Sequence, residues 1–64
     1  MMKLSEYFGK DVFITDVDGS NWQGYVVTYT PAIDSEVGED EIAVRTDAGL
    51  IGFCSSEIET IQKR

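Results

Sequence analysis

The fold is decided by residues 11–30, which read DVFITDVDGSNWQGYVVTYT. β-branched and aromatic residues, which favour strands, fill both ends of this stretch. Between them, Asp18-Gly19 followed by Ser20-Asn21 supplies the residue types of a tight hairpin turn. The stretch therefore predicts two antiparallel strands, residues 11–17 and 22–30, that are joined by a short turn.

The second strand is long and contains one glycine, Gly24. A glycine inside a strand weakens it unless the chain bends sharply or approaches another backbone closely there. A small barrel needs such a bend, and we expect any side chain at Gly24 to strike the opposite layer of the barrel. Because side chains alternate along a strand, one set then points inward. The predicted interior is Val12, Ile14, Gly24, Val26, Ile42 and Val44, whereas Tyr25, Val27 and Tyr29 are expected together on the other face.

The rest of the chain continues the same pattern. Leu4, Tyr7 and Phe8 recur at helical spacing before Gly9, so residues 1–8 are expected to form a short helix. Residues 41–46, 50–54 and 58–62 are predicted to form three further strands, with a single helical turn at residues 55–57. We therefore expect one all-β domain over residues 1–64: a small, five-stranded, strongly bent antiparallel barrel with a short N-terminal helix.

The order of these features resembles a known family. A short N-terminal helix precedes Gly9-Lys10-Asp11-Val12, and Asp18-Gly19 is followed by Trp22, Gly24 and a long bent strand. This order is similar to the first motif of Sm-like (LSm) proteins over about residues 4–30, whereas the Arg-Gly or Asn-Gly pair usual in the second motif is missing. The resemblance implies a five-stranded barrel capped by the helix, rings that pair the fourth strand with the fifth strand of the next subunit, and, in many members, RNA binding. The broader group of SH3-like barrels fits the strand pattern nearly as well.

The size of the chain favours self-association. A chain of 64 residues buries only about 60% of the surface that its unfolded form exposes, so its core alone gives marginal stability. One cysteine and no histidine exclude a disulfide framework and make a structural metal site a poor alternative. The uncharged strand at residues 50–54 has an apolar edge that a monomer would have to protect. We therefore predict a homo-oligomer that pairs this edge with residues 58–61 of another copy, with its interface on Leu50, Ile51, Phe53, Ile58, Ile61, Tyr25 and Tyr29.

Negative charge is concentrated in one segment. The chain has 12 acidic and 5 basic residues, which gives a net charge of −7. We call residues 34–41 the acidic loop, because they include Asp34, Glu36, Glu39, Asp40 and Glu41. We expect this loop to be exposed and flexible, to contribute little to stability, and to offer a docking surface to a basic protein partner. Neither its spacing nor that of Asp16-Val17-Asp18-Gly19 is that of a calcium loop, so no metal or other cofactor is predicted.

The residue types argue against catalysis and weaken the case for nucleic acid. Histidine is absent, and Cys54, the one candidate nucleophile, is expected to serve in packing, so no enzyme activity is predicted. Bound RNA would need positive charge beside the aromatic residues, for which Lys10 and Arg45 around the pore of a ring are the candidates. The leading hypothesis is a non-enzymatic Sm-like assembly module that binds a protein partner. The alternative is a ring that binds RNA or another single-stranded nucleic acid, which the net charge disfavours.

The sequence also suggests a compartment. No apolar stretch approaches the length of a membrane-spanning segment, and the first residues lack the basic and apolar regions of a signal peptide. We therefore expect no membrane association and a cytoplasmic location.

Overall fold

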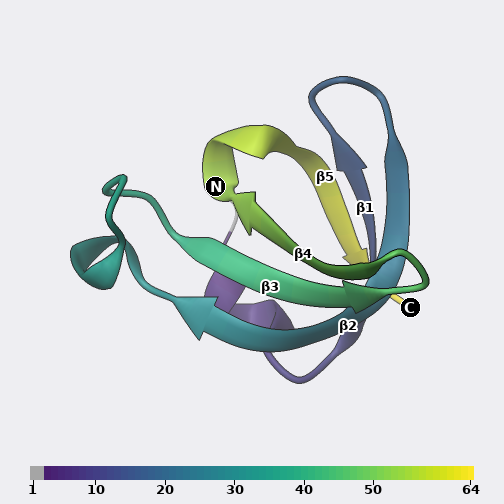
Figure 1. Cartoon of the computed structure of the whole chain (residues 1–64), viewed down its shortest axis with the longest axis horizontal. Coiled ribbons are helices and arrows are strands. Elements are labelled where there is room, and N and C mark those ends of the chain that lie inside the picture. The colour runs from purple at the N-terminus through teal and green to yellow at the C-terminus, as the bar shows by residue number, and fades with distance from the viewer. Residues whose placement is uncertain (1–2) are drawn as a thin grey trace.

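Five antiparallel strands form one sheet in the computed structural model of the chain, which describes residues 3–64 (Figure 1). The strands are β1 (Asp11–Asp16), β2 (Asn21–Thr30), β3 (Glu41–Thr46), β4 (Gly49–Cys54) and β5 (Ile58–Lys63). Their order across the sheet is β4-β3-β2-β1-β5. The all-β class and the five predicted strands are thus confirmed, with boundaries that differ from the predicted ones by one residue at most.

The helical parts are three short 3₁₀ turns: η1 (Leu4–Tyr7), η2 (Ala32–Asp34) and η3 (Ser55–Glu57). The predicted helical turn at residues 55–57 is therefore confirmed. The helix predicted for residues 1–8 is shorter than expected, because Lys3 before η1 has an extended backbone, Phe8 after it has a ψ of 129°, and no side chain caps its start. Met1 and Met2 lie outside the described residues. No helix in residues 3–64 is long and apolar enough to cross a membrane.

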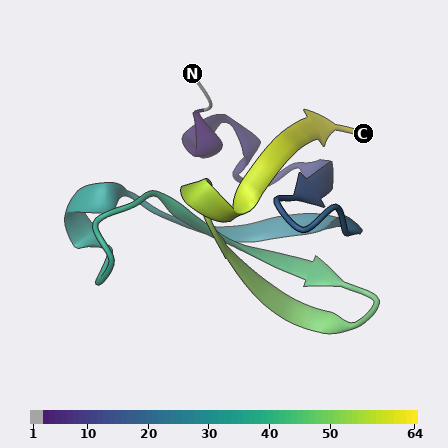
Figure 2. The same ribbon diagram turned by 90° about the horizontal axis from the view of Figure 1, so that it is seen from above.

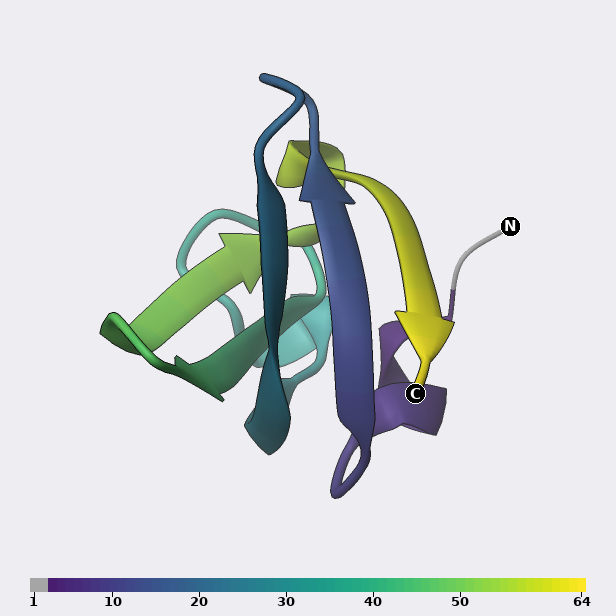
Figure 3. The ribbon, with the colours of Figure 1, turned by 90° about the vertical axis from the view of Figure 1, so that its right-hand side faces the viewer.

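The sheet is strongly curved but stays open. β4 and β5 are its two edges, and η3 connects them without any strand pairing between them. Figures 2 and 3 show why: the hairpin of β3 and β4 swings away from the hairpin of β1 and β2. The expected closure into a barrel by backbone pairing is thus absent from the described residues.

The core fills the inner face of the curved sheet. The five apolar residues predicted for the interior are all buried there, which confirms the expected alternation on β1 and β3. Four more buried side chains complete the core, and Tyr7, Trp22, Tyr29 and Ile51 pack against it. The buried set is Leu4, Val12, Ile14, Val26, Ile42, Val44, Phe53, Ile58 and Ile61.

A β-bulge in β2 separates the two tyrosines that were expected on one face. Val26 pairs with Val44, but the next pair is Thr28 with Ala43, so β2 holds one extra residue. This extra residue reverses the alternation beyond it. Tyr25 stays on the outer face, whereas Tyr29 pairs with the buried Ile42 and packs against the core. The predicted shared face of Tyr25 and Tyr29 is therefore wrong.

Gly24 lies where the backbone of β3 leaves no room for a side chain on β2. A Cβ atom added to Gly24 would collide with the backbone carbonyl oxygen of Arg45 and would lie 2.9 Å from Val44 Cγ1. The need for glycine is as predicted, but its cause is different: the obstacle is the neighbouring strand β3 and not the opposite layer of a barrel.

Candidate interaction surfaces

The outer edge of β4 exposes backbone groups. The Ser55 N–H donates to the Asp40 carbonyl at 2.9 Å, which identifies one hydrogen-bonded pair at the end of the β3–β4 ladder. Because such pairs alternate along antiparallel strands, the backbone groups of Leu50, Gly52 and Cys54 point away from β3. The Cys54 N–H is occupied, since it donates to Glu57 Oε1 at 2.8 Å. The open part of this edge is the backbone of Leu50 and Gly52.

The outer edge of β5 is partly covered. The Arg64 N–H donates to the Asp11 carbonyl at 2.9 Å, so alternation directs the backbone groups of Ile61 and Lys63 away from β1. The Tyr7 hydroxyl of η1 donates to the Ile61 carbonyl at 3.4 Å, and Lys63 Nζ lies 5.9 Å from the centre of the Tyr7 ring. The sheet therefore has two unlike edges, one open on β4 and one shared with η1 on β5.

The structure divides the predicted interface residues into two groups. Leu50 is 65% exposed and Tyr25 is 36% exposed, so both side chains are available to a partner. Phe53, Ile58 and Ile61 are buried core residues, because strand alternation directs their side chains inward. Their predicted contribution to an interface is corrected: these three side chains already pack within the chain. The half-buried Ile51 and Tyr29 also pack against the core.

Aromatic and basic side chains meet on the outer face. The strand register places Asp11, Tyr25, Arg45 and Leu50 in one row across β1 to β4. The guanidinium carbon of Arg45 lies 5.5 Å from the centre of the Tyr25 ring. A second such pair joins Arg64 to Phe13 at 5.3 Å, and Lys10 is exposed just before β1. Sequence reasoning named Lys10 and Arg45 but missed Arg64 and Phe13, because the pairing of β1 with β5 brings these two together.

Glu39 ties the acidic loop to η3. Its carboxylate accepts hydrogen bonds from the Ser55 hydroxyl at 3.0 Å, the Ser56 N–H at 2.8 Å and the Ser56 hydroxyl at 3.1 Å. These bonds, the Ser56 N–H first among them, lower the pKa of Glu39 below its usual value of 4.5. Glu39 is therefore held by η3 and is not a freely solvated side chain of the loop.

Two other acids of the loop also bond within the chain. Asp40 Oδ1 accepts from the Ala32 N–H at 2.8 Å, and Glu41 Oε2 accepts from the Ser35 hydroxyl at 2.7 Å. The tip of the loop projects from the body of the sheet (Figure 1). It exposes Asp34 and Glu36 beside two apolar side chains, Ile33 at 91% and Val37 at 60% exposure. Of the five predicted docking residues, three therefore bond within the chain and two are exposed to a partner. The bonded residues are Glu39, Asp40 and Glu41, and the exposed ones are Asp34 and Glu36.

Substitution of Glu39 tests this division. Glu39→Gln is expected to lower the denaturant midpoint at pH 7, because the neutral amide cannot replace a carboxylate that accepts three bonds. Glu36→Gln, the exposed control, should leave the midpoint unchanged. Since the pKa of Glu39 is lowered by folding, its contribution is complete above the unfolded-state pKa and disappears as pH falls through the folded-state pKa. The two variants should therefore converge in acid; equal midpoints at pH 7 would contradict the anchoring role.

Cys54 lies in an environment that disfavours its thiolate. The thiol is half-buried, and its sulfur lies 3.7 Å from Glu41 Oε1. Desolvation, followed by the negative charges of Glu41 and Glu57, raises the pKa of Cys54 to about 11. A thiol with this pKa is almost wholly protonated at neutral pH and is a poor nucleophile.

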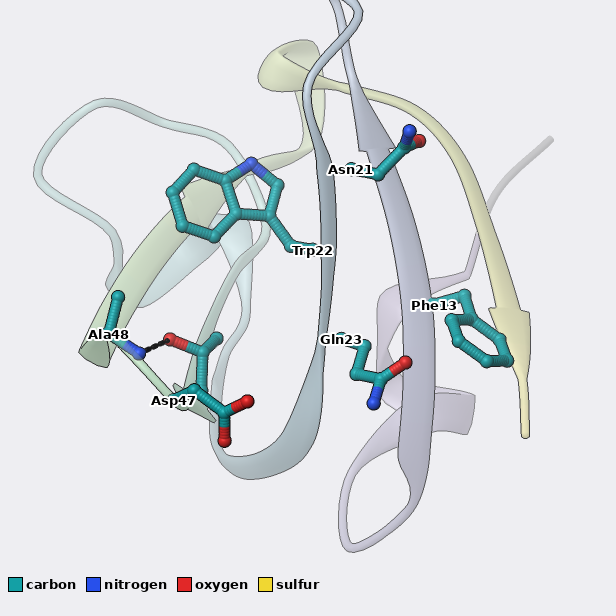
Figure 4. A pocket seen from close by; sticks show the side chains of 7 residues that line it. Phe13, Asn21, Trp22, Gln23, Asp47 and Ala48 are labelled. Atoms are coloured by element: carbon teal, nitrogen blue, oxygen red, sulfur yellow. Dashed lines mark hydrogen bonds between the residues drawn. The ribbon is translucent and has the colours of Figure 1, made fainter.

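Trp22 occupies the opening between the two hairpins, a position that sequence reasoning did not single out. Its indole N–H donates to Asp16 Oδ2 at 2.9 Å, and its ring meets Phe53 edge to face with centres 5.9 Å apart. The other Asp16 oxygen accepts from the N–H groups of Asp18 and Ser20, both at 2.9 Å. These bonds, that of Trp22 first, lower the pKa of Asp16. The indole is thereby fixed between two hollows, of about 390 Å³ and 190 Å³, and Figure 4 shows the side chains that line the larger one.

Within residues 3–64, no group of three or more acidic or cysteine side chains is arranged to hold a metal ion.

Comparison with known proteins assigns the chain to no family: no family model, curated protein or solved structure matches it.

Proposed function

We propose that the chain is a non-enzymatic, Sm-like assembly module that associates with copies of itself through β4 and β5 and binds a protein partner through its acidic loop. The observation that carries this proposal is the open sheet: among residues 3–64, the backbone groups of Leu50 and Gly52 on the edge strand β4 have no partner. β4 contains no charged residue and no proline, which are the usual means of protecting an edge. A β5 strand from another copy would supply the missing hydrogen bonds and cover Leu50.

The two edges differ, so the contact between copies is heterologous. A heterologous contact closes into a ring when the rotation per subunit allows and otherwise continues as an open chain. Each new backbone hydrogen bond contributes about 0.5–1.5 kcal/mol, to which burial of the exposed Leu50 side chain adds. Assembly would therefore also supplement the small core of the single chain.

A proline at Gly52 tests the assembly contact. The N–H of Gly52 points away from β3, so Gly52→Pro removes a donor that the single chain does not use. The N–H of Ile51 faces β3, so proline there would damage the fold itself. By light scattering, Gly52→Pro is expected to be a folded monomer near 7.1 kDa, and the wild type is expected to be larger. Gly52→Ala is the matched control, because its Cβ meets no atom within 4 Å. A wild-type monomer at tens of micromolar would refute self-association.

The tip of the acidic loop supports the second half of the proposal. The exposed Ile33 and Val37 flank Asp34 and Glu36 in the sequence, next to Glu39, which is bonded to η3. A preformed loop loses little conformational entropy when it binds. Its composition fits a partner that has an apolar depression bordered by basic side chains.

The outer face favours the alternative, a module that binds single-stranded nucleic acid. Tyr25 with Arg45 and Phe13 with Arg64 place aromatic rings beside positive charge, the combination on which unpaired bases stack. The net charge of −7 opposes it. Fluorescence anisotropy with oligo-U and single-stranded DNA at low salt separates the two functions. Affinity better than about 1 μM that falls steeply with salt would favour nucleic acid over a protein partner.

A further inference from the structure

The side of β2 that faces β3 is open along its first residues. β2 pairs with β3 only as far as Gly24 and Thr46, beyond which the turn between β3 and β4 moves away (Figure 4). The Asp16 N–H donates to the Ser20 carbonyl at 2.9 Å, which sets the alternation of the β1–β2 ladder. By that alternation the backbone groups of Asn21 and Gln23 point away from β1 and toward the gap. In residues 3–64, no backbone hydrogen bond joins the Asn21 N–H, the Asn21 carbonyl or the Gln23 N–H to that turn.

The larger hollow beside Trp22 lies at this open segment. Its volume of about 390 Å³ is within the range of sites that hold small ligands or short peptide segments. Trp22 contributes an apolar surface to it, and Asn21 and Gln23 contribute exposed amides. Asp47, on the turn between β3 and β4, is the one charged residue among those that line it. Phe13 lines the other end of the hollow, and the positively charged Arg64 lies over its ring. The hollow is therefore negative at the end formed by Asp47 and positive at the end formed by Phe13.

We propose that this hollow binds a short, extended peptide segment of a partner protein that carries a lysine or arginine. The peptide would continue the sheet beside β2 in the position that β3 vacates. Its main chain would bond to Asn21 and Gln23, its apolar side chains would pack on Trp22, and its basic side chain would pair with Asp47. Addition of a strand to a sheet edge takes its affinity from main-chain hydrogen bonds and its selectivity from the flanking side chains.

The charges of the chain argue for a different protein and against a second copy as the source of this peptide. β4, the open edge strand, carries no basic residue. Both basic side chains at the end of β5 already contact aromatic rings of their own chain: Lys63 lies over Tyr7, and the Arg64 guanidinium lies over Phe13.

The test uses ¹⁵N-labelled full-length protein and a blocked pentapeptide of alternating threonine and valine with lysine at its centre. The peptide is expected to shift the amide signals of Asn21 and Gln23 and to slow their hydrogen exchange. Trp22, the single tryptophan, reports the affinity by its fluorescence, and we expect a dissociation constant of about 1 mM or below. The same experiment on Gly52→Pro, whose change lies on β4, separates this site from the assembly contact.

Three comparisons decide the outcome. Asp47→Asn should weaken the lysine peptide about two- to fivefold, the value of an exposed ion pair, and Glu59→Gln, an exposed control on β5, should not. A peptide with glutamate in place of lysine should bind the wild-type protein at least about two- to fivefold more weakly than the lysine peptide does. The proposal is overturned if the amides of Asn21 and Gln23 do not respond at 10 mM peptide, a concentration about tenfold above the expected constant. It is also overturned if the response is confined to Leu50 and Gly52, or if the glutamate peptide binds equally well.

Discussion

Gly24→Ala is expected to remove most of the stability of the fold, and Gly24→Val all of it. The added Cβ would collide with the Arg45 carbonyl oxygen and would come within 2.9 Å of the Arg45 carbonyl carbon. Backbone atoms of a paired strand cannot rotate aside as the end of a side chain can, so relief requires that β2 and β3 separate. Insertion of atoms into a packed region costs about 1–3 kcal/mol and sometimes more, against a total of roughly 3–5 kcal/mol for a core of this size.

The measurement is chemical denaturation followed by the fluorescence of Trp22. Gly52→Ala is the matched control, because this glycine also lies inside a strand but its added Cβ meets no atom within 4 Å. We expect the control to be as stable as the wild type or slightly more stable, since alanine restricts the unfolded chain. If Gly24→Ala unfolds at the same denaturant concentration as Gly52→Ala, β2 and β3 do not approach each other as described.

Leu4→Ala should be the most damaging truncation outside the sheet. Leu4 is 0% exposed although it belongs to η1, a turn of four residues that could not persist alone in water. Its side chain joins the same core cluster as Val12 and Val26. Truncation of a buried leucine costs about 2–5 kcal/mol, because the lost contacts leave a cavity. This loss is comparable to the whole stability of the chain, so the variant is expected to be largely unfolded unless assembly supports it.

Phe8→Ala provides the comparison for Leu4→Ala. Phe8 follows η1 directly but is 56% exposed, so its removal should cost far less. Thermal unfolding of both variants at several protein concentrations would show the difference and any stabilisation by assembly. Equal unfolding temperatures for Leu4→Ala and Phe8→Ala would mean that η1 does not pack on the sheet in solution.

The strands could be predicted because their signals are local. Alternation at Val12 and Ile14 and again at Ile42 and Val44 identifies buried positions whatever the sheet order, since each depends only on the period of a strand. Asp18-Gly19 identifies a turn for an equally local reason: Gly19 adopts a φ of 85°, which glycine reaches without strain. The positions of these residues could therefore be predicted without knowing which strands pair.

The placement of the acidic loop and of Tyr25 and Tyr29 was harder to predict from the sequence, because it depends on residues elsewhere in the chain. The sequence predicts that Glu39 is one of several solvated acids, because its partners Ser55 and Ser56 follow it by 16 and 17 residues. The position of Tyr29 depends on a bulge, which forms when β2 pairs with β3 and leaves no distinctive residue in the sequence. The contact between Phe53 and Trp22 across the opening between the hairpins likewise joins residues that are far apart in the sequence.

By itself, the sequence determined the all-β class, the five strands, the turn at Asp18-Gly19 and most of the inner core. Only the tertiary structure decided that the sheet stays open, that β4 exposes Leu50 and Gly52, and that a hollow lies between Trp22 and Asp47. The physical reason is the range of the interactions. Backbone preference and side-chain period act over a few neighbouring residues, whereas edges and hollows arise where strands far apart in sequence pair or diverge.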